Sequence, residues 1–246
     1  MIPRKLLGTA EIPGGEQLRL IRHGGDFVIM IGRNELMNTR MRGSEEALAT
    51  MSCARIAGRA DTRLLIGGYG MGFTLRAALA ALPSNAHITV AELVPEIIDW
   101  AHGPMQDVAA GCLDDPRVHI VADDVVEVIR SRPASFDAIL LDVDNGPDGL
   151  VREANNQLYS QQGLKAAQAA LRPGGVLAIW SAGKDDAFAR RLKNVGFAVD
   201  EVAVRARGNG KGAKHVIWFA TKSRGASLDA RRFPSQRPTR STHNVS

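Results

Sequence analysis

Polar and apolar residues alternate near the start of the chain, at 18–22 and again at 27–31. Successive side chains of a strand point to opposite faces, so a period of two predicts β-strands. The turn residues Gly24, Gly25 and Asp26 separate the two runs, and this arrangement predicts a hairpin. A third short strand is expected at 35–38. Residues 1–42 are therefore predicted to form a small antiparallel N-terminal β region.

Beyond residue 63, short apolar runs alternate with longer segments of helical period. Strands are expected at 64–67, 88–91, 118–121, 138–142 and 176–180, and helices near 72–82, 95–110, 124–131, 159–171 and 184–195. Runs such as 138–141 have no polar face, which is typical of strands buried on both sides in a parallel sheet. The pattern predicts an α/β fold with a mostly parallel sheet and helices on both faces.

Two further segments define the limits of this domain. Ser44 is followed by two glutamates, which predicts a helix N-terminus with Ser44 as the N-cap. Towards the other end, apolar runs at 198–204 and 215–220 flank a basic, glycine-rich loop and predict an antiparallel hairpin at the sheet edge. The α/β domain is therefore expected to span residues 43–222.

Charge and composition narrow the function classes. The net charge of the chain is +5, but residues 223–246 hold five arginines against one aspartate, which is 5 − 1 = +4. This segment has almost no aliphatic residues and is predicted to be a disordered basic tail. The body carries about +1 and few aromatic residues, so nucleic acid is not an expected partner. Cys53 and Cys112 lack metal-ligand spacing, so no metal is expected. Without a leader or a long apolar run, the sequence predicts a cytoplasmic protein that does not enter a membrane.

A glycine-rich loop follows the first apolar run of the α/β segment, and a second run ends on Glu92. Glycines let the backbone approach a ligand, and an acid about 20 residues later is placed to bind ribose hydroxyls. Phe73 stands where a dinucleotide motif has its third glycine, which favours S-adenosyl-L-methionine or its decarboxylated form over NAD. The residues expected to bind this cofactor are Gly67, Gly68, Gly70, Gly72, Glu92, Leu93, Asp123 and Asp124.

Two further strand ends carry carboxylates. Asp123 is placed to accept a hydrogen bond from an adenine amino group, although it could equally be the N-cap of the helix at 124–131. Asp142 and Asp144 follow another strand and are the candidate catalytic residues, because ligands bind at the carboxyl ends of such strands. The alternative for this pair is a simple turn, in which aspartates are common.

These residues give the chain a resemblance to the polyamine aminopropyltransferases, of which spermidine synthase is the type. The resemblance covers about residues 15–220 and includes the hairpin, the glycine loop, Glu92, Asp123 and the Asp142 loop. It implies a small β-domain followed by a Rossmann-like class I methyltransferase fold. It also implies decarboxylated S-adenosylmethionine as donor and an aminopropyl group passed to a small-molecule amine. Tyr159, at the start of the following helix, and Glu45 are then candidate substrate-binding residues.

The chain departs from that family's usual motifs at three places. The catalytic loop reads Asp142-Val143-Asp144, whereas the family typically has Asp-Ser-Ser-Asp. Ser44-Glu45 stands where the family has a Tyr-Gln pair, and Tyr69 and Met71 interrupt the glycine loop. The acceptor therefore stays open, as does the choice between aminopropyl and methyl transfer. A methyltransferase of a non-polyamine substrate and a non-catalytic adenosyl-ligand-binding protein are the alternatives. A homodimer through the N-terminal hairpin is also possible.

Overall fold

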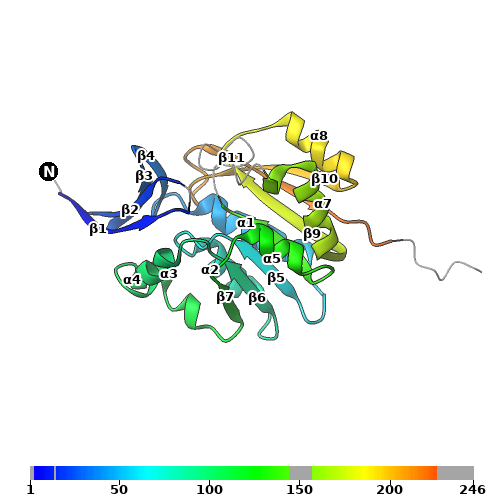
Figure 1. The fold of residues 1–246 in the computed structure, drawn as a ribbon, viewed down its shortest axis with the longest axis horizontal. Helices are drawn as coiled ribbons and strands as arrows, with labels where there is room; N and C mark the ends of the chain where they lie inside the picture. The colour runs from blue at the N-terminus through cyan, green and yellow to red at the C-terminus, as the bar shows by residue number, and fades with distance from the viewer. Residues whose placement is uncertain (1–2, 14, 144–156, 226–246) are drawn as a thin grey trace, which may run out of the picture.

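The computed structural model describes residues 3–13, 15–143 and 157–225. Four antiparallel strands form an N-terminal sheet in chain order, and Figure 1 shows it standing apart at the left. Its strands are β1 (Arg4–Glu11), β2 (Gln17–His23), β3 (Asp26–Ile31) and β4 (Asn34–Asn38). The predicted hairpin is β2 and β3, in which Leu20 pairs with Ile29 and both are buried. The sequence reading missed β1, an edge strand with little regular burial.

A seven-stranded mixed sheet forms the rest of the molecule, in the order β10-β11-β9-β8-β5-β6-β7. Its strands are β5 (Arg63–Gly67), β6 (His87–Ala91), β7 (Val118–Val121), β8 (Phe136–Leu141), β9 (Leu171–Ser181), β10 (Ala198–Arg205) and β11 (Lys214–Thr221). The five strands β5 to β9 run parallel, and β10 and β11 form the predicted antiparallel edge hairpin. Every residue of β8 is buried, which agrees with its continuous apolar pattern.

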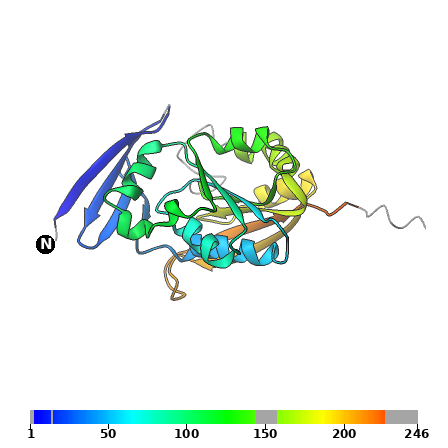
Figure 2. The same cartoon turned by 90° about the horizontal axis from the view of Figure 1, so that it is seen from below.

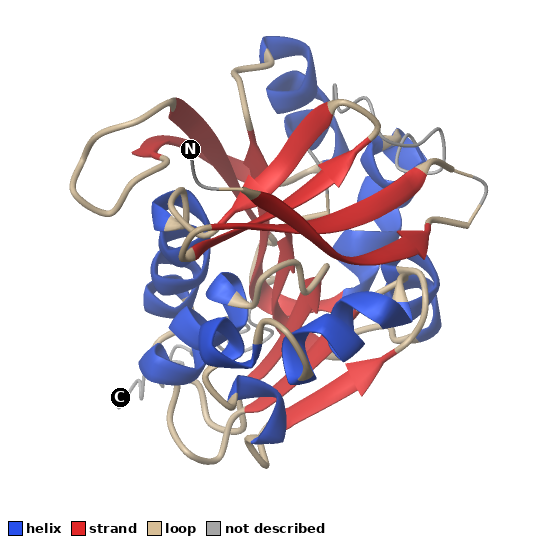
Figure 3. Ribbon diagram, turned by 90° about the vertical axis from the view of Figure 1, so that its left-hand side faces the viewer, coloured by secondary structure: helices blue, strands red, loops and turns tan. Residues whose placement is uncertain are grey.

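Helices cover both faces of this sheet, as Figures 2 and 3 show. The helices are α1 (Gly43–Arg55), α2 (Phe73–Ala81), α3 (Pro95–His102), α4 (Gln106–Ala109), α5 (Val125–Ser131), α7 (Gln161–Ala170) and α8 (Asp186–Val195). Alternate residues of β8 belong to two different cores, Leu140 with α1 to α3 and Ile139 with α5, α7 and α8. The N-terminal sheet packs into the first of these cores. The predicted α/β fold with an N-terminal β region is confirmed.

Helix boundaries differ from the sequence reading in three places. The helix expected at 95–110 is two helices, because the chain turns at Gly103 and resumes as α4 at Gln106. Ser44 is not an N-cap, since α1 begins at Gly43 and its N-cap is Arg42. The helix expected from 159 begins at Gln161, because the Ser160 hydroxyl accepts the Gly163 N–H and caps it.

No helix in the described ranges is long and apolar enough to cross a membrane. The predicted basic tail falls outside the described residues from 226 onward.

Candidate active site

The glycine loop leaves β5 and brings its backbone close to the end of β8. Gly68 has a φ of +83°, and a Cβ there would lie 2.6 Å from the Asp142 carbonyl oxygen. Gly70 has a φ of +57°, and a Cβ there would meet the Met37 side chain at 2.9 Å. Only glycine fits both the left-handed backbone and the close approach. The loop is therefore a cradle of bare backbone facing a cleft.

Glu92 follows β6 and is buried at 5% exposure. Its Oε2 accepts the Tyr69 N–H at 2.8 Å and its Oε1 accepts the Val94 N–H at 2.9 Å. Burial raises its pKa, and the backbone N–H groups oppose that shift. A carboxylate oxygen can accept more than one hydrogen bond, so both oxygens can also accept from a ligand. The side chain is fixed by the glycine loop before any ligand arrives.

Asp123 and Asp124 follow β7, and they divide two roles between them. Asp124 is the N-cap of α5, where its Oδ1 accepts the Val126 N–H at 2.9 Å. The N-cap alternative considered for Asp123 is therefore wrong. Asp123 accepts the Asp124 N–H at 2.7 Å through Oδ1 and is otherwise exposed.

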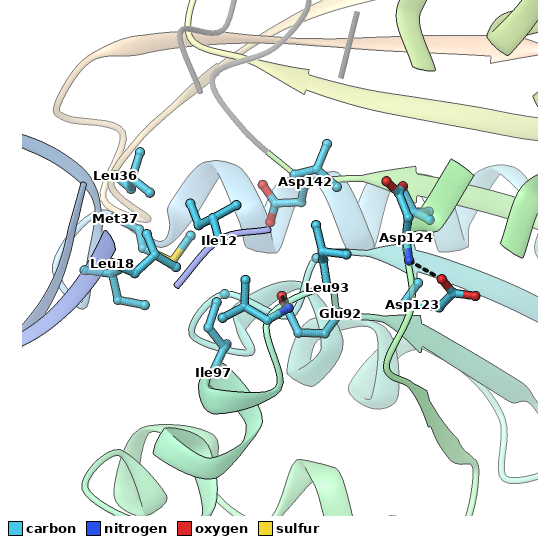
Figure 4. A pocket seen from close by; sticks show the side chains of 17 residues that line it. Ile12, Leu18, Leu36, Met37, Glu92, Leu93, Ile97, Asp123, Asp124 and Asp142 are labelled. Atoms are coloured by element: carbon cyan, nitrogen blue, oxygen red, sulfur yellow. Dashed lines mark hydrogen bonds between the residues drawn. The ribbon is translucent and has the colours of Figure 1, made fainter. Parts of the chain in front are cut away.

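These elements enclose a first cleft of about 810 Å³, open to solvent at its mouth. In Figure 4, Leu18, Leu36 and Met37 of the N-terminal sheet lie at one end of it and the two aspartates at the other. The cleft is lined by Ile12, Leu18, Ile29, Leu36, Met37, Gly68, Gly70, Ala91, Glu92, Leu93, Val94, Ile97, Asp123, Asp124, Val125, Asp142 and Val143. The N-terminal sheet thus faces the carboxyl ends of β5, β6 and β8 and supplies an apolar wall.

Asp142 follows β8 and lines this cleft from the opposite side to Glu92. Its Oδ2 accepts the Thr74 hydroxyl at 2.8 Å. Burial raises its pKa to about 6, although the Thr74 hydrogen bond opposes the shift. A carboxyl with that pKa is ionised at neutral pH and holds a proton more readily than an exposed aspartate does.

A second cleft of about 870 Å³ adjoins the first. Four residues line both clefts, namely Leu36, Met37, Asp142 and Val143. The second cleft is also lined by Glu35, Asn38, Met41, Ser44, Glu45, Trp180, Ala182 and His215. Asp142 is the one carboxylate that both clefts share among the described residues.

Glu45 lies on the first turn of α1 in this second cleft. Burial, then the neighbouring Asp142 and Glu46 carboxylates, raise its pKa well above the usual value. Its Oε2 is inaccessible to solvent and has no hydrogen-bond partner among the described residues. His215 and Trp180 line the same cleft: the His215 Nδ1 lies 2.9 Å from the Ser44 hydroxyl, and the ring centroids of His215 and Trp180 lie 4.7 Å apart.

Several predicted residues lie away from the two clefts. Gly67 and Gly72 shape the loop but line neither cleft, and Tyr159 is buried in the core, edge-on to Phe188 at 5.7 Å. Asp144 lies outside the described residues. The sequence reading missed Trp180, His215 and the apolar wall. Trp180 ends a predicted strand, which is the site position in this fold, but no local pattern marks the others.

Comparison with known proteins relates this geometry to a family. A family model described as "Spermine/spermidine synthase domain" matches residues 43–187. The polyamine aminopropyltransferase of Mycobacterium tuberculosis (strain CDC 1551 / Oshkosh) is 38% identical over 119 residues, which is 47% of this chain and 22% of that protein. Polyamine aminopropyltransferase 2 of Pseudomonas aeruginosa is 32% identical over 143 residues, 54% of this chain and 38% of that protein. These matches cover well under two thirds of the relatives' own lengths.

Solved structures share the fold. Spermidine synthase from Thermotoga maritima superposes with a TM-score of 0.70 at 19% identity, covering 89% of this chain and 73% of that one. A spermidine synthase in complex with the transition state analogue AdoDATO superposes with a TM-score of 0.68, also at 19% identity and with the same coverage. The family match spans more than half of the chain and contains the glycine loop, Glu92 and Asp142. The chain therefore belongs to the spermine/spermidine synthase family.

Proposed function

We propose that this chain is an aminopropyltransferase that binds decarboxylated S-adenosylmethionine in the first cleft and an amine in the second. The observation that carries the proposal is the position of Asp142 on the wall that the two clefts share. A group transferred from a donor in the first cleft to an acceptor in the second must move past Asp142. The family match and the named activities of the relatives support the same reaction class.

The residues of the first cleft suit an adenosyl donor. A Cβ at Gly68 would fill the space where backbone meets backbone, so the loop offers the bare surface that a nucleoside needs. Glu92 is fixed by two backbone N–H groups and can accept from two ribose hydroxyls. Because Asp124 caps α5, the Asp123 carboxylate is available to accept a hydrogen bond from an adenine amino group.

Charge favours the decarboxylated donor over S-adenosylmethionine itself. The described residues lining the two clefts include six carboxylates and no lysine or arginine. The carboxylates are Glu35, Glu45, Glu92, Asp123, Asp124 and Asp142. A donor with its own carboxylate would meet like charge without a cationic partner, whereas a cationic amine is attracted. The same reasoning favours aminopropyl transfer over methyl transfer.

The reaction requires the acceptor nitrogen to lose a proton as it attacks. When bound, the donor supplies a carbon next to a sulfonium, and its C–S bond breaks as the new C–N bond forms. Asp142 accepts the nitrogen's proton, for which a pKa of about 6 suits work near neutral pH. Thr74 holds the carboxylate in one orientation through its hydroxyl. The Glu45 carboxyl, whose pKa burial and Asp142 raise, ionises as the protonated amine enters the second cleft beside it.

Product analysis tests this proposal. The protein, given decarboxylated S-adenosylmethionine and a panel of primary amines, should release methylthioadenosine and form aminopropylated amine. Asp107→Asn removes a carboxylate at an exposed position on α4, outside both clefts. It is the control for substitutions within the clefts and should keep the wild-type rate. Methylation of an amine from S-adenosylmethionine, or tight binding of methylthioadenosine without turnover of any amine, would contradict it. The second outcome would favour a non-catalytic adenosyl-ligand-binding protein.

A further inference from the structure

Two buried polar atoms in the second cleft lack hydrogen-bond partners. They are Oε2 of Glu45 and Nε1 of Trp180, and among the described residues they are the only buried side-chain polar atoms without one. A carboxylate oxygen accepts hydrogen bonds, whereas an indole N–H can only donate one. Unpaired buried polar groups are unfavourable, and functional sites are one recognised reason for keeping them. A ligand that satisfies both atoms must therefore donate at one point and accept at another.

A chain of contacts connects the shared wall of the clefts with Trp180. Thr74 lies beside the shared wall, with its hydroxyl bonded to Asp142 and 3.5 Å from the Glu45 carbonyl oxygen. The preceding residue on α1, Ser44, contacts His215, and His215 packs edge-on against Trp180. Negative charge thus gathers beside the shared wall, and the indole donor lies beyond the Ser44–His215 contact.

Among the described residues, Trp180 Nε1 has no carboxylate or other hydrogen-bond partner. Burial lowers the pKa of His215, so its ring is neutral at neutral pH. A simple α,ω-diamine has an ammonium at each end, and an ammonium has donors but no acceptor. Its second ammonium would leave the indole N–H unpaired.

We infer that the amine acceptor carries a neutral hydrogen-bond-accepting group, such as a hydroxyl, at the end away from its reacting nitrogen. This inference rests on the proposed function, since it names the class of amine for the same site. The reacting amine lies between Asp142 and Glu45, and the distal oxygen accepts the Trp180 N–H. An amino alcohol satisfies both orphan atoms, and its chain crosses the cleft past Met41.

Glu35 provides the competing arrangement. It also lines the second cleft, and its exposed carboxylate accepts the Asn38 side-chain amide at 2.5 Å. A diamine could direct its second ammonium to Glu35 and ignore Trp180. The two arrangements predict different effects of substitution. In one the distal group of the acceptor binds the Trp180 N–H, and in the other it binds the Glu35 carboxylate.

A matched pair of acceptors tests the inference with the intact chain. We compare 1,4-diaminobutane with 4-aminobutan-1-ol, which have equal length, by methylthioadenosine release from decarboxylated S-adenosylmethionine. The wild type should prefer the amino alcohol in kcat/KM. Trp180→Phe keeps the ring and removes the donor, so it should reduce that preference about tenfold. Glu35→Gln removes the competing carboxylate and should leave the preference unchanged, and Asp107→Asn, at an exposed position on α4, is the control variant.

The opposite pattern overturns the inference. A wild type that prefers the diamine, loses that preference in Glu35→Gln and is indifferent to Trp180→Phe uses the competing arrangement, and the proposed function then still stands. If neither amine is consumed, the proposed function fails. In that case NMR titration of the same two amines, with methylthioadenosine bound, decides the inference on affinity alone, and equal or weaker binding of the amino alcohol rejects it. The comparison in the wild type holds even if Trp180→Phe fails to fold.

Discussion

Asp142 is buried, which disfavours its ionised form but raises its pKa into a range that suits proton transfer. Removal from water destabilises its ionised form, and the Thr74 hydroxyl recovers part of that loss by hydrogen bonding to the carboxylate. The result is a carboxyl that changes charge near pH 6. Below that pH the folded protein holds it protonated, and a protonated carboxyl cannot accept a proton from an amine. The activity should therefore depend on the ionisation of Asp142, whose pKa burial raises.

Substitution of Asp142 checks this at the level of one residue. In the wild type, kcat/KM should fall as the pH drops through about 6. Asp142→Asn keeps the shape and removes the base, so kcat/KM should fall about 10²-fold or more and lose that acid limb. Methylthioadenosine should still bind, by calorimetry. An unchanged pH profile in the variant would exclude Asp142 as the base.

Thr74→Val gives a finer test of the same group. Because the Thr74 hydroxyl lowers the pKa of Asp142, its removal should move the acid limb to higher pH, with activity retained above it. Thr50→Val is the matched control, since Thr50 is exposed on α1 and its hydroxyl contacts only backbone carbonyls of its own helix among the described residues. A limb that shifts equally in both variants would mean that helix packing, not this hydrogen bond, sets the pH dependence.

The sequence located residues by strand ends, and that reasoning reached Gly68, Glu92, Asp123 and Asp142. It worked because parallel strands bring their carboxyl ends to one edge, whatever lies between them in sequence. It could not reach His215, which lines the second cleft through contacts with α1 and Trp180. Only tertiary packing brings His215 next to α1 and Trp180. It also left open whether Asp123 caps α5, because adjacent aspartates look alike in a sequence and only the backbone geometry shows that Asp124 is the cap.

At the scale of elements, the glycine loop and the end of β8 are packed backbone against backbone. Gly68 and Gly58 share nearly the same φ, +83° and +80°, but a Cβ at Gly58 meets nothing within 4 Å. The pair therefore separates the effect of a left-handed backbone from the effect of crowding.

Alanine at each position tests that distinction. Gly58→Ala should lower the free energy of unfolding by about 1–2 kcal/mol and leave ligand affinity unchanged. Gly68→Ala should lower it further and weaken methylthioadenosine binding at least about tenfold, because the Asp142 carbonyl must move. Thermal unfolding and calorimetry give the two readouts. Equal effects of the two variants on affinity would show that the close approach is not needed for binding.

Element boundaries were predictable where the chain carries its own signal. Buried parallel strands appear as apolar runs, so β5, β6 and β7 were found almost to the residue, whereas β8 begins two residues before the predicted start because Asp137 interrupts the apolar run. The edge strand β1 gave no such signal, because a strand at the rim of a small sheet buries few side chains. The break between α3 and α4 does carry a signal, the turn dipeptide Gly103-Pro104, which the prediction of one helix over 95–110 overlooked.

At the opposite edge of the sheet, Asp137 joins the amino ends of three strands. Arg59 and Arg172 bond its two carboxylate oxygens at 2.7 and 3.0 Å, and the Arg63 N–H adds a third bond at 2.9 Å. Asp137→Ala should destabilise the protein by about 2–3 kcal/mol, a Tm loss of about 5–10 °C, without changing kcat/KM below the transition. Asp61→Asn, half-exposed with the same kinds of partners and suited to the left-handed backbone at that position, should change Tm little.

For the whole molecule, the first cleft is built from both sheets, so a ligand in it contacts residues of each sheet. Methylthioadenosine should therefore slow hydrogen exchange at 34–38 in the N-terminal sheet as well as at 68–72 in the glycine loop. The edge strand β10 lines neither cleft and serves as the internal control. Protection confined to the glycine loop would mean that the N-terminal sheet takes no part in donor binding.

The two clefts share part of the N-terminal sheet but differ in the rest of their lining. Every carboxylate that lines the first cleft lies between Glu92 and Asp142. The second cleft alone is also lined by residues of the segment 180–215, and no residue of that segment lines the first cleft. Substitutions there can therefore reshape the second cleft and leave every residue that lines the first unchanged.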